Sequence, residues 1–247
     1  MRSKYWFYSW KGGYTQVLAL AEALDGRIIK RENSNYAFKE GDVVVNWGSS
    51  IIPPPLVGID VLNQFSKVGH GKLQNWQDLR DKGIQVPEWT LFKDTAQAWN
   101  CRVVARNQDH GMGGLGITVY QKGDILGDHK FYVKYVKKGR EFRFHVFKGK
   151  VIFVQEKLRK RDTLNVDKYV RSHGRGWCFA FKHLPDNSPP TSGNELAIQS
   201  VATLNLDFGA VDMGWNNGSA YTVFEVNSAP GIENTSLAAY VEAFRNV

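Results

Sequence analysis

Three oxygen-bearing side chains near the C-terminus have the types and spacing of a divalent-cation site. Asp212 follows an apolar, strand-like run, and Glu225 and Asn227 lie two residues apart in the next such run. Residues i and i+2 of a strand point to the same face of a sheet. Carboxylate and amide oxygens are ligands that suit Mg²⁺, which usually shares them with nucleotide phosphates. The alternative is an exposed sheet face with two ordinary acids, and the core-like apolar residues around Glu225 argue against it.

A second pair of side chains with potential chemistry, Glu141 and Arg143, lies in the segment REFRFHVF at 140–147. A fixed guanidinium that faces a transferring phosphoryl group stabilises the charge that develops there. An exposed Glu–Arg pair would instead be a common and weak structural contact. The alternation of charged and aromatic residues predicts an antiparallel strand with one face toward water.

Four glycines, Gly111, Gly113, Gly114 and Gly116, follow the segment VVARN. Glycine permits positive φ and lets backbone N–H groups approach a phosphate closely. The loop joins two predicted strands, whereas the Walker A and dinucleotide motifs open a helix, so it matches neither. A flexible hairpin loop with no ligand is the alternative reading of these glycines.

The elements that would position these residues follow from apolar periodicity. Before residue 100 we predict strands at 4–10 and 42–47, a helix at 15–24, a boundary at the three prolines 53–55, helices at 60–68 and 73–83, and an extended segment at 86–92. After residue 100 we predict strands at 101–107, 117–121, 130–136, 140–147, 150–158, 208–215 and 220–230, and helices at 194–206 and 236–247. Residues 157–175 are basic and irregular.

Composition narrows the function classes. The chain has 247 residues, 43% of them hydrophobic, a formal net charge of +8 and an isoelectric point near 9.4. These values indicate a globular protein with anionic partners. The two cysteines form no metal or disulfide pattern. We find no apolar run long enough for a membrane helix and no secretory signal, so we expect a cytoplasmic protein that does not bind membranes.

The order of these motifs resembles that of the ATP-grasp superfamily, and within it the RimK-type and D-alanine–D-alanine ligase-like carboxylate–amine ligases. The resemblance runs from about Lys72 to the C-terminus, and its most specific part is AVDMGW followed by YTVFEVNSAPGIE. It implies an α/β (α+β) fold with a small N-terminal α/β lobe and two α+β subdomains that clasp the nucleotide. It also implies ATP and Mg²⁺ as cofactors, with Asp212, Glu225 and Asn227 as the metal ligands.

The resemblance assigns further roles one residue at a time. Phosphate contacts fall to Lys72, to the glycine loop, and to Arg106, which stands where the family usually has lysine. Val133 takes the place of the family's acidic hinge residue. The adenine would lie beside Lys134 and the backbone of Tyr135 and Val136, and Glu141 would reach the ribose. Arg143 would face the γ-phosphate and the acyl-phosphate intermediate; the weaker match VRSHGRGW supplies Arg171 as a second catalytic residue and His173 and Arg175 as substrate contacts.

We therefore expect a reduced N-terminal lobe at 1–66 and two ATP-grasp subdomains at 67–135 and 136–247. Lys11, at the carboxyl end of the first strand, is a further substrate candidate, although a tight turn explains it more simply. The resemblance implies a ligase that joins a carboxylate to an amine through an acyl phosphate, with small-molecule or peptide substrates. Two alternatives stay open, namely a kinase on the same scaffold and a basic module that binds nucleic acid.

Overall fold

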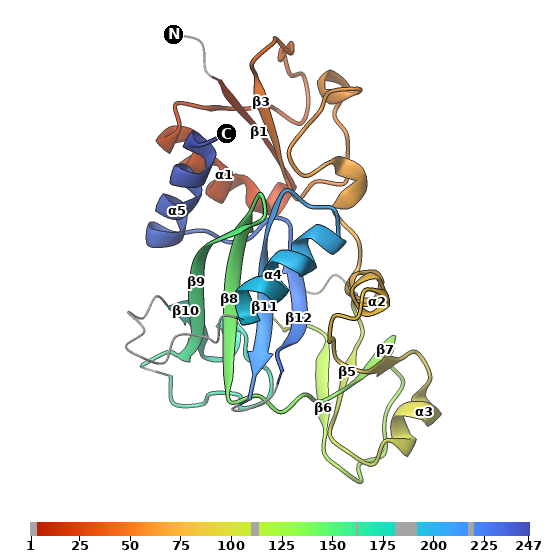
Figure 1. The fold of residues 1–247 in the computed structure, drawn as a ribbon. Helices are drawn as coiled ribbons and strands as arrows, with labels where there is room; N and C mark the ends of the chain where they lie inside the picture. Colours follow the sequence, from red (N-terminus) through yellow and green to blue (C-terminus); the bar gives the residue numbers. More distant parts are fainter. Residues whose placement is uncertain (1–3, 110–113, 162, 181–191, 217–219) are drawn as a thin grey trace.

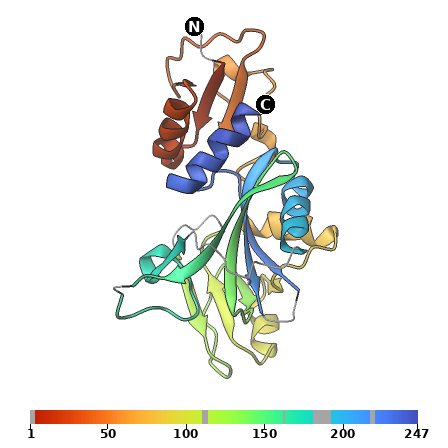
Figure 2. The same cartoon turned by 60° about the vertical axis from the view of Figure 1, so that its left-hand side comes forward.

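Three β-sheets form the framework of the protein. The computed structural model describes residues 4–109, 114–161, 163–180, 192–216 and 220–247. The first sheet lies at one end of the molecule, a five-stranded sheet forms its middle, and a four-stranded sheet lies at the other end (Figures 1 and 2). The predicted α+β architecture is confirmed.

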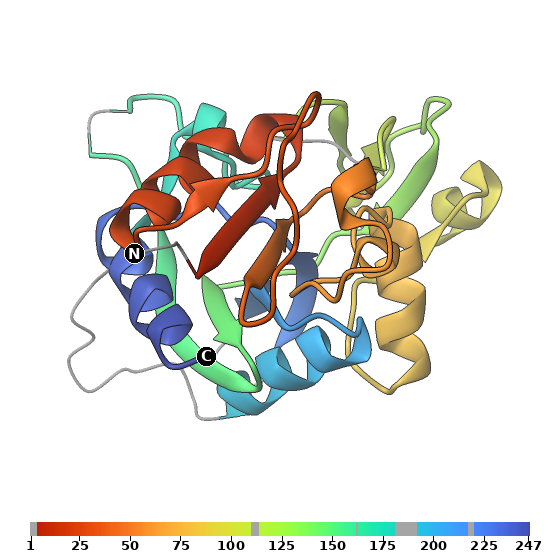
Figure 3. The same cartoon turned by 90° about the horizontal axis from the view of Figure 1, so that it is seen from above.

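The first sheet is parallel, with β1 (Tyr5–Ser9) between β2 (Arg27–Ile28) and β3 (Val43–Trp47). Alternate side chains of β1 enter two different cores, as the period of a strand requires. Tyr5 and Phe7 pack with α1 (Tyr14–Ala23) and α5 (Asn234–Arg245), whereas Tyr8 packs on the opposite face. Both helices therefore cover the same face of this sheet (Figure 3).

The chain between β3 and α2 differs from the prediction. We predicted a helix at 60–68, but Leu62 forms a parallel bridge with Val45, and only the 3₁₀ turn Phe65–Lys67 follows. Asn63 has a φ of +59°, which is incompatible with a continuous helix. Two further 3₁₀ turns, Lys11–Gly13 and Pro54–Leu56, lie earlier in the chain.

The four-stranded sheet is antiparallel, in the order β4 (Trp89–Thr90), β7 (Phe131–Lys134), β5 (Val103–Arg106), β6 (Ile117–Tyr120). One face packs against Trp76 of α2 (Lys72–Asp81), and the other packs against Ala96 of α3 (Lys93–Ala98). The helix α2 ends near Gly83 as predicted, with Gly83 at a φ of +77°. The short helix α3 was not predicted.

The five-stranded sheet is antiparallel, in the order β10 (Trp177–Ala180), β9 (Lys150–Arg159), β8 (Arg140–Phe147), β11 (Phe208–Trp215), β12 (Thr222–Asn227). The helix α4 (Ser192–Thr203) covers one face, where Phe142, Phe144 and Met213 form the largest core (Figure 1). The other face of β8 was predicted to contact water. That prediction is wrong, because Glu141 and His145 are buried there.

The segment 157–175 is less irregular than predicted. Its first residues continue β9 to Arg159, and the 3₁₀ turn His173–Arg175 leads into β10, a strand that the sequence did not indicate. The two ends of the described chain lie together, since Lys4 Nζ donates a hydrogen bond to the Val247 carbonyl at 2.7 Å. Among the described residues, no helix combines the length and apolarity needed to cross a membrane.

Candidate functional site

The site is built on one row of residues across the five-stranded sheet. Arg143 of β8 is the register partner of Asp212 on β11, and Asp212 is the partner of Glu225 on β12. Paired residues of antiparallel strands share a face, so these three side chains lie on the same side, away from α4. The row joins the two predicted carboxylates and the predicted catalytic arginine.

Arg143 and Asp212 form a bidentate ion pair. Arg143 Nε donates to Asp212 Oδ1 at 2.6 Å, and a terminal guanidinium nitrogen donates to Oδ2 at 2.8 Å. Burial acts to raise the pKa of Asp212, but Arg143, together with Lys157 and Lys72, holds the pKa of this carboxyl below its ordinary value. Burial likewise acts to lower the pKa of Arg143, and Asp212 more than compensates, so that pKa is raised. Both groups are therefore charged at neutral pH.

The second carboxylate is also paired, by a residue from another part of the chain. Lys72 Nζ lies 3.2 Å from Glu225 Oε1 and also donates to the Phe224 carbonyl at 3.2 Å. The indole of Trp76, one turn further along α2, donates to the same carbonyl at 3.1 Å. These contacts fasten α2 to β12 and fix the position of Lys72.

The start of α2 depends on the loop after β5. Asp109 accepts a hydrogen bond from the Leu73 backbone N–H at 3.0 Å and so satisfies one free donor of the first turn. A Cβ on Gly71 would overlap this carboxylate, so the close approach requires glycine. Asp109 therefore helps to place Lys72 in the site.

Lys72, Arg143, Asp212 and Glu225 line a cavity of about 400 Å³ between the four-stranded and five-stranded sheets, hereafter the main cavity. An apolar part of its wall includes Trp76, Val104 and Val133. Most predicted site residues among the described ones line it: Lys72, Arg106, Gly114, Lys134, Tyr135, Val136, Glu141, Arg143, Arg171, His173, Asp212 and Glu225.

The remaining predicted residues lie elsewhere. Asn227 lines a second cavity of about 280 Å³, which shares Lys72 and Glu225 with the main cavity. Its side-chain nitrogen is buried and makes no hydrogen bond within the described part of the chain. Gly111 and Gly113 are outside the described residues. Lys11, Gly116 and Arg175 line neither cavity; Lys11 is exposed, Gly116 has a φ of +67°, and Arg175 pairs with Asp167 at 2.6 Å.

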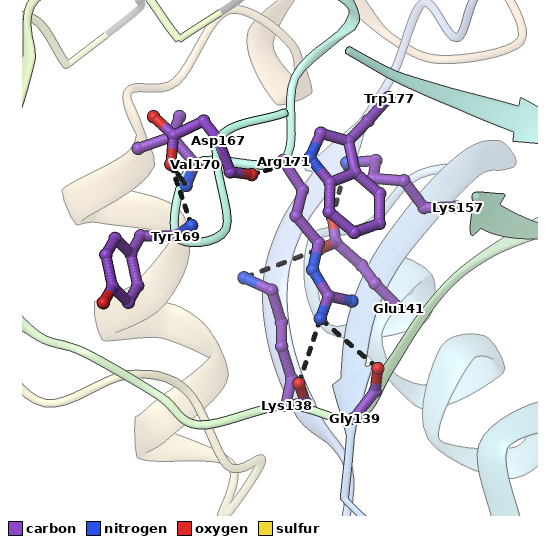
Figure 4. A network of polar contacts seen from close by, with 9 residues as sticks. All are labelled: Lys138, Gly139, Glu141, Lys157, Asp167, Tyr169, Val170, Arg171 and Trp177. Atoms are coloured by element: carbon purple, nitrogen blue, oxygen red, sulfur yellow. Dashed lines mark hydrogen bonds and ion pairs between the residues drawn. The ribbon is translucent and has the colours of Figure 1, made fainter. Parts of the chain in front are cut away.

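Glu141 is enclosed by cations that the sequence analysis did not connect with it (Figure 4). It forms ion pairs with Lys157, its neighbour on β9, and with Lys138 at 3.5 Å. Burial lowers the pKa of Lys138, with Glu141 acting in the opposite direction. The spacing of Lys138 and Glu141 (i, i+3) gives no signal outside a helix, and the Lys157 pair depends on the register of β8 and β9.

Arg171 lines the main cavity and reaches the backbone at Lys138 and Gly139 (Figure 4). Its guanidinium donates to the carbonyls of Lys138 at 3.1 Å and Gly139 at 3.3 Å, and it lies 4.6 Å from the Trp177 ring centroid. Trp177 is a further cavity residue that the sequence did not identify. The arginine thus links the irregular 160–176 segment to the connection between β7 and β8.

A second arginine links the same segment to the four-stranded sheet. Arg102 lies 4.1 Å from the Tyr169 ring centroid and 5.1 Å from that of Tyr135, and both tyrosines line the main cavity. Arg175 donates to the Gly114 carbonyl at 3.4 Å. The 160–176 segment therefore contacts both sides of the cavity.

The connection after β7 has its own polar contacts. Lys134 pairs with Glu88 at 2.6 Å, and the Tyr135 backbone N–H donates to the Arg102 carbonyl at 3.0 Å.

Burial lowers the pKa of Arg106, and the nearby acids Glu225 and Asp109 act in the opposite direction. Arg106 thus faces the main cavity from the four-stranded sheet.

This fold recurs in solved structures. The ATP-grasp ligase PsnB, complexed with a minimal precursor, matches with a TM-score of 0.73 at 12% identity over 100% of this chain and 99% of that one. D-alanine–D-alanine ligase from Bacillus anthracis gives 0.67 at 15% identity over 98% and 92%. The macrocyclase MdnC, bound to precursor peptide MdnA from Microcystis aeruginosa MRC, gives 0.61 at 13% identity over 98% and 100%.

The chain has the ATP-grasp fold, as the sequence resemblance implied. No protein-family model matches the sequence, and no curated protein matches it. At identities of 11–15%, the likeness to the solved structures concerns the fold. What this site does must therefore be argued from its own residues.

Proposed function

We propose that this protein is an ATP- and Mg²⁺-dependent, ADP-forming ligase that joins a carboxylate to an amine. The observation that carries the proposal is the row Arg143–Asp212–Glu225 facing the main cavity. It combines two carboxylates for a hard cation with a guanidinium for a phosphoryl group. The ATP-grasp fold and the ligase neighbours support the same reaction class.

The donor set fits magnesium. Glu225 and Asn227 share a face of β12, and Asp212 is the register partner of Glu225. Within the described residues, the Asn227 side-chain nitrogen makes no hydrogen bond, so the amide can turn its oxygen toward a ligand. Asp212, Glu225 and Asn227 would hold Mg²⁺ there, and the ion would supply positive charge that neutralises the ATP phosphates.

The same cavity has separate regions for the parts of the nucleotide. Its apolar wall at Trp76, Val104 and Val133 suits the adenine ring. Because the Tyr135 N–H already has a partner, we assign recognition of the adenine edge to the Val136 backbone and to Lys134. Glu141 would accept hydrogen bonds from the ribose.

Positively charged side chains line the main cavity together with the carboxylates Asp212 and Glu225. Lys72 and Arg106 would contact the phosphates, and the glycine loop, with Gly111, Gly113, Gly114 and Gly116, would cover them. Arg171 and His173 also line the cavity and are proposed to contact the intermediate and the substrate. Lys11 and Arg175 are weaker substrate candidates, because neither lines a cavity.

The reaction divides into two displacements. A carboxylate oxygen of the substrate attacks the γ-phosphorus, the bond to the bridging oxygen breaks, and ADP leaves. The amine nitrogen then attacks the acyl carbon of the acyl phosphate, phosphate leaves, and the nitrogen loses a proton. Arg143 would hold the transferring group and stabilise its charge, so most of the catalysis is positioning and electrostatics.

Water must be excluded while the acyl phosphate exists, because its hydrolysis wastes ATP. The 160–176 segment is placed for this role, since Arg171 and Arg175 tie it to both sides of the cavity. PsnB and MdnC are described with precursor peptides. We accordingly include peptide carboxylates among the substrates, beside small anionic acids.

The test is a product assay with hydroxylamine as the trapping amine. Pools of small carboxylic acids and acidic peptides are incubated with ATP and Mg²⁺, and hydroxamate and ADP are measured together. Equal amounts of ADP and hydroxamate support the ligase. ADP with a stable phosphorylated product and no hydroxamate would instead identify a kinase, and no nucleotide turnover in any pool would contradict both.

A further inference from the structure

Each predicted metal carboxylate already has a cation bound to it, and the two cations come from different parts of the fold. Arg143 holds both oxygens of Asp212 at 2.6 and 2.8 Å, and Lys72 lies 3.2 Å from Glu225. Lys72 is on α2, whereas Arg143 is on β8 of the central sheet. A metal ion must therefore compete with two resident partners.

Electrostatics makes that competition unfavourable for a metal ion alone. The four paired side chains carry two positive and two negative charges, so their sum is zero. An added divalent cation would leave an excess of two positive charges in a largely buried site, where Arg106 and Lys157 also line the cavity. Removing a partner from a buried ion pair is strongly unfavourable unless the freed charge finds a new one.

Nucleotide phosphates would supply those new partners. Lys72 and Arg143 both line the main cavity, so each can turn from its carboxylate toward an anion in that space. The exchange would release Asp212 and Glu225 for the metal at the moment the phosphates arrive. The cation and the nucleotide would then bind with strong mutual dependence.

We propose that Lys72 and Arg143 act as resident counter-ions that prevent divalent-cation binding until a nucleotide is present. This inference rests on the proposed function, because it uses the proposed metal ligands. It adds an order of events, in which the phosphates exchange with the carboxylates as partners of the two cations. The consequence is that the free enzyme does not hold the metal in the absence of ATP.

The chain offers a matched control. Arg140 and Glu156 form another bidentate pair, with both N–O distances at 2.8 Å, and neither residue lines the main cavity. Replacing Arg140 removes an ion pair of the same type from the same sheet. Any effect on metal binding that is common to Arg140→Met and Arg143→Met would be general, and any difference belongs to the site.

The experiment measures Mn²⁺ binding by electron paramagnetic resonance and calorimetry, with and without the ATP analogue AMPPNP. Mn²⁺ accepts the same oxygen ligands as Mg²⁺. In the absence of nucleotide, we expect wild type and Arg140→Met to bind Mn²⁺ only weakly. Lys72→Met and Arg143→Met should bind it at least about tenfold more tightly, because each frees a carboxylate.

Lys72→Met keeps the test valid if Arg143→Met does not fold. Its partner Glu225 has 41% of its side chain exposed, so loss of the lysine leaves no fully buried charge. With AMPPNP, wild-type Mn²⁺ affinity should rise by at least about tenfold, and AMPPNP affinity should rise equally with Mn²⁺.

Three results would overturn the proposal. Equal binding of Mn²⁺ by wild type with and without AMPPNP would leave the nucleotide site standing and show that only the exchange is wrong. If Lys72→Met and Arg143→Met both bind Mn²⁺ no more tightly than Arg140→Met, the exchange is likewise wrong and the nucleotide site still stands. Failure of AMPPNP to bind wild type under any condition would contradict the proposed function as well.

Discussion

Strand β8 carries two arginine–carboxylate pairs three residues apart, and they differ in surroundings rather than in geometry. Arg140–Glu156 and Arg143–Asp212 are both bidentate, with N–O distances of 2.6 to 2.8 Å. Odd and even residues of a strand face opposite sides of a sheet. The first pair therefore lies on the α4 side, and the second faces the main cavity.

The neighbours of each pair explain the contrast. Arg143 lies 4.0 Å from the Phe179 ring centroid, and Asp212 is in register with Glu225, which has its own lysine. Neither Arg140 nor Glu156 lines the main cavity. An ion pair away from the cavity holds two strands together, whereas linked pairs beside a cavity can exchange partners with a ligand. Geometry alone thus does not distinguish a structural pair from a functional one.

The largest difference between the two pairs should appear in catalysis. Once a carboxylate substrate is identified, Arg143→Met should lower the rate of hydroxamate formation by about 10²- to 10³-fold, the cost of losing one transition-state charge partner. Arg140→Met should change it by less than about threefold, because that pair does not face the cavity. Rates are compared at saturating ATP. Equal losses in the two variants would mean that β8 pairs act only through strand packing.

The second prediction concerns the buried histidine beside the row. Burial lowers the pKa of His145 from its ordinary 6.5 to about 4, and Gln155 Oε1 accepts a hydrogen bond from the ring Nε2 at 2.9 Å. The folded state therefore favours neutral His145. The contribution of this histidine to the free energy of unfolding is complete above pH 6.5 and is lost as the pH falls toward 4. The shift corresponds to roughly 3 kcal/mol of unfolding free energy.

Denaturant unfolding at pH 7 and pH 4 measures this contribution. Between pH 7 and pH 4, the free energy of unfolding should fall less in His145→Gln than in wild type, and the difference should approach roughly 3 kcal/mol. A parallel fall in the two proteins would show that His145 titrates normally in the folded state.

The third prediction tests the apolar face of the sheet. A Cβ on Gly193 of α4 would lie 2.8 Å from Phe144 and 3.0 Å from Tyr221. Gly193→Ala should destabilise the protein by about 1–3 kcal/mol through overpacking. Gly231, which has open space around it, serves as the control, and Gly231→Ala should change stability by less than about 0.5 kcal/mol. A neutral Gly193→Ala would mean that α4 can shift away from the sheet.

The smallest effect is expected at the start of α2. Asp109→Ala removes the side-chain acceptor for the Leu73 N–H and should cost about 0.5–2 kcal/mol. Because the helix holds Lys72, AMPPNP binding should weaken as well. Asp78, an exposed carboxylate later in the same helix that bonds Gln74, is the control residue. If Asp78→Ala costs as much as Asp109→Ala, the cap has no special role.

Much of the fold followed from periodicity in the sequence. The strands that carry Asp212 and Glu225 lie where the apolar runs predicted them, and the register of β11 and β12 puts these two carboxylates on one face. The error on the polar face of β8 has a physical cause. Alternation of polar and apolar residues marks a polar environment, but it does not distinguish water from a buried ionic network.

Other features depended on contacts between distant parts of the chain. The Lys72–Glu225 pair joins α2 to β12, and the Lys157–Glu141 pair depends on the register of β8 and β9. Neither pair has a local sequence signal. The same holds for β10, whose pairing with β9 was not indicated by its short run of mixed residues.

The most direct test of the central claim is calorimetric titration of AMPPNP with and without Mg²⁺. The proteins are wild type, the double variant Asp212→Asn/Glu225→Gln, and Glu156→Gln as the control on the opposite face. We expect Mg²⁺ to strengthen nucleotide binding in wild type and in Glu156→Gln, and the double variant to lose this Mg²⁺-dependent part. Retention of Mg²⁺-dependent binding by the double variant would contradict the assignment of the carboxylate row as the metal site.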